Sequence, residues 1–230
     1  MNTVSLRVSV PICGLRKGYA REYLETEQVP PPATVYGFLL SLVGEEDRNV
    51  HVGTRLAIAV LKQPAVSTVL RTVWRVKNQV GGPGIGNNKK PDYQELLTGL
   101  EFAVWVAGGS LAERLRLIGS PADITRHGGL SLGESRDLVN DVSLFKCLGE
   151  VSGTWLVSDD AGEHPLPVWV DHVGARVTKR LQFALRKGVL ETPPEGDPRW
   201  ICIEPPEVQE SDKVPITRKA QKGTKKRQTR

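Results

Sequence analysis

Residues 29–44, VPPPATVYGFLLSLVG, join a proline run directly to a short apolar segment with the spacing of a helix. Proline fixes its own φ and disfavours helix at the residue before it, so the predicted helix begins at about Pro32. Gly44 is expected to end it. Between them, apolar residues recur at i, i+3, i+4, i+7 and i+8, which predicts one apolar stripe on an amphipathic helix. The stripe consists of Val35, Phe38, Leu39, Leu42 and Val43.

The segment before the prolines mixes cations with aromatic residues and has neither strand nor helix periodicity. We therefore expect a cationic loop that leads into a helix start, an arrangement that suits an anion and above all a polyanion. Tyrosines in the loop and in the helix can stack on bases. The candidate binding residues here are Arg16, Lys17, Tyr19, Arg21 and Tyr36.

The composition is that of a soluble globular protein, with 39% hydrophobic and 25% charged residues among 230. No apolar run approaches a membrane span, and residues 1–10 alternate where a signal peptide would be continuously apolar. We therefore expect a cytoplasmic protein without membrane contact. Its 3 cysteines and 4 histidines are scattered without metal-binding or disulfide spacing, which predicts no metal and no cofactor.

The net charge of +5 is concentrated at the C-terminus. Residues 211–230 carry eight basic side chains against Asp212, so the rest of the chain is slightly acidic. We expect residues 209–230 to be a tail that stays disordered until it meets nucleic acid or an acidic partner. A solubilising tail without specific contacts is the alternative.

Two strand patterns frame the helix. Residues 3–10 alternate strictly, which predicts a half-buried strand, and residues 54–61 are almost continuously apolar, which predicts a central one. Residues 66–78 alternate again and lead into the glycine-rich, basic segment VGGPGIGNNKK. We expect a β-hairpin over about 66–98 with a mobile tip. The GxGxG in this tip is not a nucleotide-binding fingerprint, because no helix opens immediately after it.

A second unit of strand, helix and strand follows the hairpin. Residues 100–107 form an apolar strand, and Ser110 begins the S-x-x-E pattern of a capping box for a helix that Gly119 ends. A glycine-rich loop then leads to a strand at about 137–144. The order predicts an α+β, ferredoxin-like (RRM-like) βαββαβ domain over residues 1–145 with the hairpin inserted, an architecture that commonly binds RNA.

Residues 146–208 change to short strands separated by turn and proline signals. They predict a small β-rich C-terminal unit that packs on the first domain. Its expected strands cover residues 149–156, 167–172, 176–185 and 200–203.

The predicted hairpin has one cationic face and a second basic pair near its tip. An extended cationic arm is the preferred interpretation, and the solvated face of an edge strand is the alternative. Trp74 falls on the opposite, apolar face, so we expect it in the core rather than against a base. The candidate binding residues of the arm are Arg71, Arg75, Lys77, Asn78, Lys89 and Lys90.

The loop before the strand at about 137–144 contains G-x-S-x-G at residues 129–133, the pattern of a hydrolase nucleophile elbow. An elbow needs a buried strand before the serine and a helix after it. Here a polar loop and a strand take those places, so a hydrolase is a minor alternative. We prefer a loop whose glycines let a phosphate backbone approach, and a flexible surface loop is the other alternative. The candidate binding residues are Arg126, His127, Gly128, Gly129, Ser131, Gly133 and Arg136.

Three segments together resemble a known family, the fifth of the numbered CRISPR-associated (Cas) core proteins, within the RAMP superfamily. They are residues 29–44, the hairpin LRTVWRVKNQ…NNKKPDYQELL, and the loop and strand GGLSLGESRDLVNDVSLF. The similarity covers about residues 1–145 well and the rest loosely, and it is greatest to the DevS-like branch.

The resemblance implies a non-catalytic subunit of the type I CRISPR surveillance complex Cascade. In that family the glycine-rich loop and the first helix hold the 5′ handle of the CRISPR RNA (crRNA). The inserted hairpin, or thumb, folds over the guide and displaces a nucleotide beside the neighbouring backbone subunit. The protein would cap one end of the complex and contact the large subunit that reads the PAM, so it would meet target DNA only indirectly.

Some members of the family also cleave precursor crRNA without metal, using tyrosine, lysine and histidine. Tyr19, Lys17 and His127 are residues of those types, but nothing in the sequence fixes their mutual distances. We therefore expect no catalytic residues, with a metal-independent endoribonuclease as the alternative.

Overall fold

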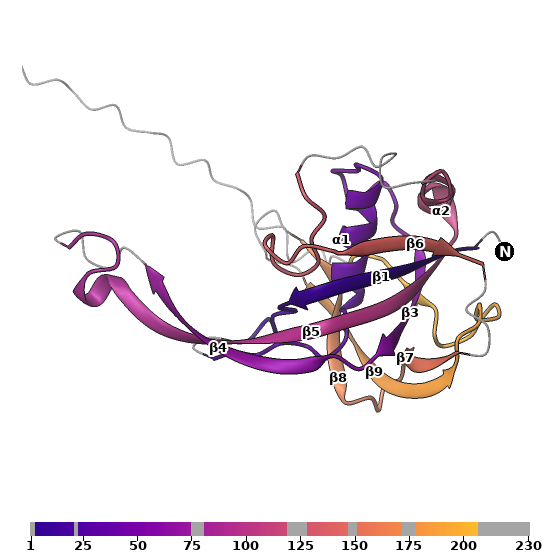
Figure 1. Ribbon diagram of the computed structural model, residues 1–230. Coiled ribbons are helices and arrows are strands. Elements are labelled where there is room, and N and C mark those ends of the chain that lie inside the picture. Colours follow the sequence, from indigo (N-terminus) through magenta and orange to yellow (C-terminus); the bar gives the residue numbers. More distant parts are fainter. Residues whose placement is uncertain are drawn as a thin grey trace, which may run out of the picture.

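The computed structural model describes residues 3–20, 23–74, 81–118, 128–146, 151–171 and 178–206. Within them the chain forms one 10-stranded sheet and two α-helices (Figure 1). The strands are β1 (Thr3–Cys13), β2 (Tyr23–Leu24), β3 (Arg55–Lys62), β4 (Ala65–Trp74), β5 (Lys89–Ala107), β6 (Asp141–Phe145), β7 (Ser152–Ser158), β8 (His164–Val170), β9 (Thr178–Val189) and β10 (Ile201–Cys202). The helices are α1 (Pro32–Leu42), α2 (Gly109–Arg116) and the short 3₁₀-helix η1 (Gly86–Asn88).

The main path of the sheet runs β6-β1-β5-β3-β7-β9-β8, and each neighbouring pair along it is antiparallel. The segment with α1 connects β1 to β3, and α2 connects β5 to β6, so the architecture is α+β. The predicted C-terminal strands continue this same sheet, because β7 pairs with β3 at Ala59↔Trp155 and Val60↔Thr154. Among the described residues no helix is long and apolar enough to cross a membrane.

Helix α1 begins at Pro32, as the proline run predicts, and Gly44 follows it with φ +66°. The prediction of a single apolar stripe was too narrow. Tyr36 and Leu40 are buried as well, because β8 packs on the helix and brings the Trp169 ring to 6.2 Å from the Tyr36 ring, centroid to centroid. Helix α1 is therefore a core helix with elements on more than one side.

A second hydrophobic cluster lies apart from the one that contains the two helices. The Trp105 ring lies 4.6 Å from that of Trp155 and 5.5 Å from that of Phe145, centroid to centroid. The guanidinium of Arg199 lies over the Trp155 ring at 4.8 Å. The central strands are thus buried on both faces, which explains the continuous apolar pattern of β3.

The predicted hairpin is present as an arm formed by β4 and the first half of β5, and it projects away from the body (Figure 1). The strand predicted at 100–107 is not separate, since β5 runs without a break from the arm into the sheet. Gly99, with φ +71°, lies between the part of β5 that pairs with β4 and the part that pairs with β3. A positive φ is readily available only to glycine, and it lets the strand bend at this point.

The predicted capping box at Ser110 was wrong. The N-cap of α2 is Gly108, with φ +85° and no side-chain cap. Ser110 Oγ instead lies 2.9 Å from His51 Nδ1, which joins α2 to the segment that follows α1. The predicted end at Gly119 lies outside the described residues, and the helix itself ends at Arg116.

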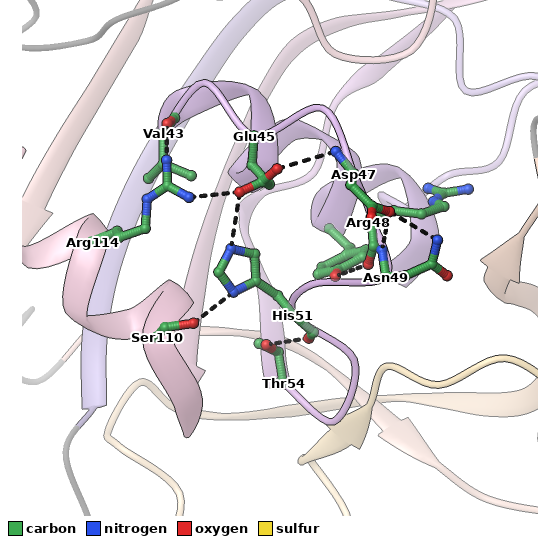
Figure 2. A network of polar contacts seen from close by, with 10 residues as sticks. Val43, Glu45, Asp47, Arg48, Asn49, His51, Thr54, Ser110 and Arg114 are labelled. Carbon is green, nitrogen blue, oxygen red and sulfur yellow. Dashed lines mark hydrogen bonds and ion pairs between the residues drawn. The ribbon is translucent and has the colours of Figure 1, made fainter.

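The polar cluster around His51 connects the two helices (Figure 2). Arg114 of α2 donates to Glu45 Oε2 at 2.8 Å and to the carbonyl of Val43 at the end of α1, and His51 Nε2 lies 3.7 Å from the same Glu45 oxygen. Burial lowers the pKa of His51, and the positive charge of Arg114 acts in the same direction against the carboxylate of Glu45. Neutral His51 therefore belongs to the stable form of this junction.

Candidate nucleic-acid interface

The glycine-rich loop is clamped onto the end of β1 by a buried carboxylate. Asp137 Oδ2 accepts the backbone N–H of Gly14 at 2.8 Å and that of Glu134 at 3.1 Å. Gly133 has φ +95°, and a Cβ built on it would lie 2.7 Å from the carbonyl oxygen of Gly14. The loop can approach β1 this closely only because residue 133 has no side chain. The clamp also makes the strand start at Asp141, later than the predicted 137.

The same loop is tied to β5 at the base of the arm. Gln94, which is 1% exposed, donates through Nε2 to Glu134 Oε1 at 2.9 Å and accepts a hydrogen bond from Arg136 Nη2 at 2.6 Å. A Cβ on Gly14 would lie 2.9 Å from Gln94 Nε2. Chain segments that are 40 to 123 residues apart thus meet at one point.

The cationic loop that follows β1 is hydrogen-bonded to Glu95, the residue of β5 that follows Gln94. The hydroxyl of Thr26 accepts the N–H of Leu15 at 2.9 Å, and the N–H of Thr26 donates to Glu95 Oε2 at 3.0 Å. The hydroxyl of Tyr23 donates to the other oxygen of Glu95 at 3.0 Å. Because Gln94 and Glu95 are adjacent, the cationic loop and the glycine-rich loop converge at the base of the arm, a region that we call the arm junction (Gly14, Gln94, Glu95 and Asp137).

Several predicted binding residues lie on the surface around the arm junction. Tyr19 is 58% exposed, and Arg16 is exposed and forms no ion pair within the described residues, although its guanidinium donates to the carbonyl of Ala20 at 3.1 Å. Gly128 is exposed, with φ +80°, and Gly129 is also exposed. These residues leave both side chains and backbone accessible to a ligand.

Acidic neighbours offset part of the positive charge. Three of the predicted cations lie beside carboxylates: Lys17–Glu25 at 3.7 Å, Arg71–Asp92 at 3.4 Å and Arg136–Glu134 at 2.9 Å. Desolvation lowers the pKa of Lys17, but Tyr19, Glu25 and Glu27 outweigh it and raise the pKa above its ordinary value. The interface is therefore a set of ordered, partly neutralised cations rather than a uniformly positive patch.

The arm carries exposed apolar groups beside its cations. Trp74, expected in the core, is 70% exposed, and it pairs across the hairpin with Lys89. Its indole covers Gly84, where a Cβ would lie 2.7 Å from the ring. Lys90 pairs with Val73. The prediction failed because the residues on both faces of β4 are exposed or only partly buried, so alternation along β4 does not separate core from surface.

Tyr36 is not available for stacking on a base. Its side chain is 0% exposed, and its hydroxyl donates to the carbonyl of Arg48 at 2.6 Å. Burial raises the pKa of Tyr36 to about 12. Its inclusion among the candidate binding residues was therefore wrong, because a fully buried ring belongs to the core.

Ser131 pairs through an isolated β-bridge with Leu138 and is partly exposed, whereas the side chain of its neighbour Leu132 is buried in the core. No helix follows it within residues 128–146, so the local structure of a nucleophile elbow is not formed there. Six other candidates lie outside the described residues and stay predictions. They are Arg21, Arg75, Lys77, Asn78, Arg126 and His127.

Four residues of the arm junction were not predicted from the sequence. Gly14, Gln94, Glu95 and Asp137 bind other parts of the chain rather than presenting positive charge. They are neither cationic nor aromatic, and no local sequence pattern distinguishes them from other residues of the same types. Within the described part of the chain, no group of three or more histidine, cysteine, aspartate or glutamate residues is placed to hold a metal ion.

The chain is similar to CRISPR-associated proteins in sequence and in fold. No family model matches it. It is 45% identical over 199 residues to a Myxococcus xanthus (strain DK1622) protein named CRISPR-associated protein Cas5, across 83% of this chain and 92% of that relative. A solved chain described as "CRISPR RNA-guided surveillance complex" superposes with a TM-score of 0.60 at 12% identity, over 86% of this chain and 96% of that one.

A second solved chain, described as "Crystal structure of Cas protein", gives a TM-score of 0.50 at 15% identity, over 82% of this chain and 94% of that one. Likeness at such low identity shows the fold alone. The relative that is 45% identical over most of both chains shows more: the protein belongs to the CRISPR-associated Cas5 family.

Proposed function

We propose that this Cas5-family protein is a subunit of a type I CRISPR surveillance complex, Cascade, and that it binds the 5′ handle of the crRNA. The observation that carries the proposal is the arm junction, where two predicted RNA-binding loops meet at the base of a projecting arm. The Cas5 relative and the structural likeness to a chain of an RNA-guided complex support it.

The arm junction suits a single strand of RNA in three ways. Exposed glycine backbone in the loop lets phosphates approach, Arg16 and Lys17 supply charge from the other loop, and the ring of Tyr19 can stack on a base. Since the cations are already positioned by neighbouring carboxylates and carbonyls, little side-chain ordering is needed on binding.

We assign the arm as the thumb that folds over the guide beside the neighbouring backbone subunit. Its cations Arg71, Lys89 and Lys90 contact phosphates, and its exposed Trp74 offers a flat apolar group to a base or to a neighbouring subunit. The protein then caps the backbone at one end and contacts the large subunit that reads the PAM, and target DNA is met indirectly.

We infer that the N-terminal part is a ferredoxin-like domain. Two β-α-β units interleave in one antiparallel sheet: β1 and β3 flank β5, and β5 and β6 flank β1. Interleaving of this kind is the arrangement of the split β-α-β fold. The hairpin between the two units is then the insertion that forms the arm.

We propose that the subunit is not catalytic. The alternative is a metal-independent endoribonuclease. Lys17 Nζ lies 6.0 Å from the centroid of the Tyr19 ring, so two of the residue types that such enzymes use are close together. Incubation of the purified protein with repeat RNA in EDTA distinguishes an RNA-binding subunit from an endoribonuclease. Uncleaved RNA supports the binder, whereas cleavage that Lys17→Ala or His127→Ala abolishes would establish the endoribonuclease.

The binding function is tested by retention of crRNA in the co-purified complex over a range of salt. Arg16→Ala and Arg71→Ala should each reduce retention, and loss of one phosphate contact lowers the salt slope of binding to a single strand by about 0.7. Arg186→Ala is the matched control, because Arg186 is an exposed arginine, 3.2 Å from Asp159, on strand β9. Equal retention in all three variants would refute the assignment.

A further inference from the structure

A cavity of about 480 Å³ lies at the end of β1 away from the arm junction. The start of β1, the end of α2 and the end of β6 form its walls, together with Thr192. β1 has 11 residues, so at about 3.3 Å per residue its two ends are about 33 Å apart. A ligand in the cavity would therefore not compete with RNA at the arm junction.

Two residues that line this cavity each have a buried polar atom without a hydrogen-bond partner among the described residues. These atoms are Nη2 of Arg116 and Oγ1 of Thr3. Leaving a buried donor unpaired is costly, and a guanidinium cannot lose its charge to relieve that cost. The position of Arg116 in the last turn of α2 suits the helix dipole but leaves Nη2 unpaired. A bound group that accepts hydrogen bonds would satisfy both atoms once their side chains turn toward it.

The lining favours an anion. Arg116 and Lys146 both face the cavity, and none of the described residues that line it is acidic. A second hollow of about 420 Å³ shares Thr3 and Thr192 and includes Glu195, but that carboxylate lies 3.7 Å from Arg55. Two cations and two threonine hydroxyls are the donors that hold phosphate groups in proteins.

The opposite wall is apolar. Leu144 is 41% exposed, and Phe145 is half-buried with its ring against Trp105. A volume of about 480 Å³ falls in the range of about 300–1,000 Å³ typical of small-molecule sites. We propose that this cavity binds a nucleotide unit, with its 5′ phosphate on Arg116, Lys146 and Thr3 and its base against Leu144 and Phe145.

Calorimetric titration of the full-length protein tests the site with four probes: 5′-AMP, adenosine, inorganic phosphate and a 5′-phosphorylated trinucleotide. We expect saturable binding of 5′-AMP that is stronger than that of adenosine or phosphate. Stronger binding of the trinucleotide would assign the site to the end of a strand, and stronger binding of 5′-AMP would assign it to a free nucleotide. Absence of saturable binding by all four at millimolar concentration would overturn the proposal.

Two variants keep the test independent of folding. Arg116→Gln should weaken binding about tenfold or more, and Thr3→Val, which keeps the shape of the side chain, about threefold. Both should unfold at no lower urea concentration than wild type in the absence of ligand, because each removes an unpaired buried group. Arg186→Gln is the control and should bind as wild type. Wild-type affinity in Arg116→Gln would refute the site, whereas retention of crRNA in the complex tests the arm junction separately.

Discussion

Replacement of Gly133 by alanine tests how closely the glycine-rich loop approaches β1. The new Cβ would lie 2.7 Å from the carbonyl oxygen of Gly14 and 3.3 Å from Asp137 Oδ2, and φ is +95°. The positive φ costs about 1 kcal/mol or more for a residue with a side chain. Relief of the contact requires the loop to retreat, which weakens the hydrogen bond from Gly14 N–H to Asp137. A bond to a charged group contributes about 1.5–3 kcal/mol.

We therefore expect Gly133→Ala to lower the free energy of unfolding by about 3 kcal/mol. Gly128→Ala is the matched control, because Gly128 lies in the same loop with φ +80° but a Cβ there would meet no atom of the described residues within 4 Å. It should cost about 1 kcal/mol. For a chain of this size the difference of about 2 kcal/mol corresponds to about 4–8 °C in Tm.

Urea denaturation of the two purified variants measures this difference directly. The displaced loop should also lower crRNA retention in the complex for Gly133→Ala more than for Gly128→Ala. If the two variants unfold at the same urea concentration, the close approach at Gly14 does not hold the loop, and the account of the arm junction fails.

Three further perturbations separate core from surface. Tyr36→Phe removes the buried hydrogen bond to the Arg48 carbonyl and should lower the free energy of unfolding in urea by about 1–2 kcal/mol. It should leave crRNA retention unchanged. Reduced retention would show that Tyr36 belongs to the interface after all. The side chain of Trp74 is 70% exposed, so Trp74→Ala should change the free energy of unfolding by less than about 0.5 kcal/mol. The same substitution should weaken crRNA retention. Unchanged retention would show that Trp74 is not part of the interface. Burial lowers the pKa of His51 below 6.5, so the unfolded chain binds the proton more readily and stability should fall as pH drops below about 6.5. His51→Gln should reduce this loss of stability at acid pH. If the variant loses as much stability as wild type, protonation of His51 is not its cause.

The arm junction was the part of the candidate interface least accessible from the sequence. Cationic loops, a hairpin and flexible glycines are visible as composition and spacing, and the structure contains the hairpin and brings the two loops together. That Lys17, Arg71 and Arg136 are each paired with a carboxylate was not visible, because their partners are ordinary acidic residues whose proximity depends on register and loop path.

The sequence by itself determined the features that depend on backbone sterics and short-range periodicity. The start of α1 at Pro32, the central strand β3 and the hairpin are of this kind, since each follows from φ restriction or from alternation within about ten residues. Only the tertiary structure decided which side chains are surrounded. Tyr36 is buried by a strand more than 100 residues later, Ser110 bonds His51 instead of capping its helix, and Trp74 is exposed because its strand leaves the body. Burial and hydrogen-bond pairing depend on which distant segment of the chain packs against a residue. The local sequence pattern contains no information about that segment.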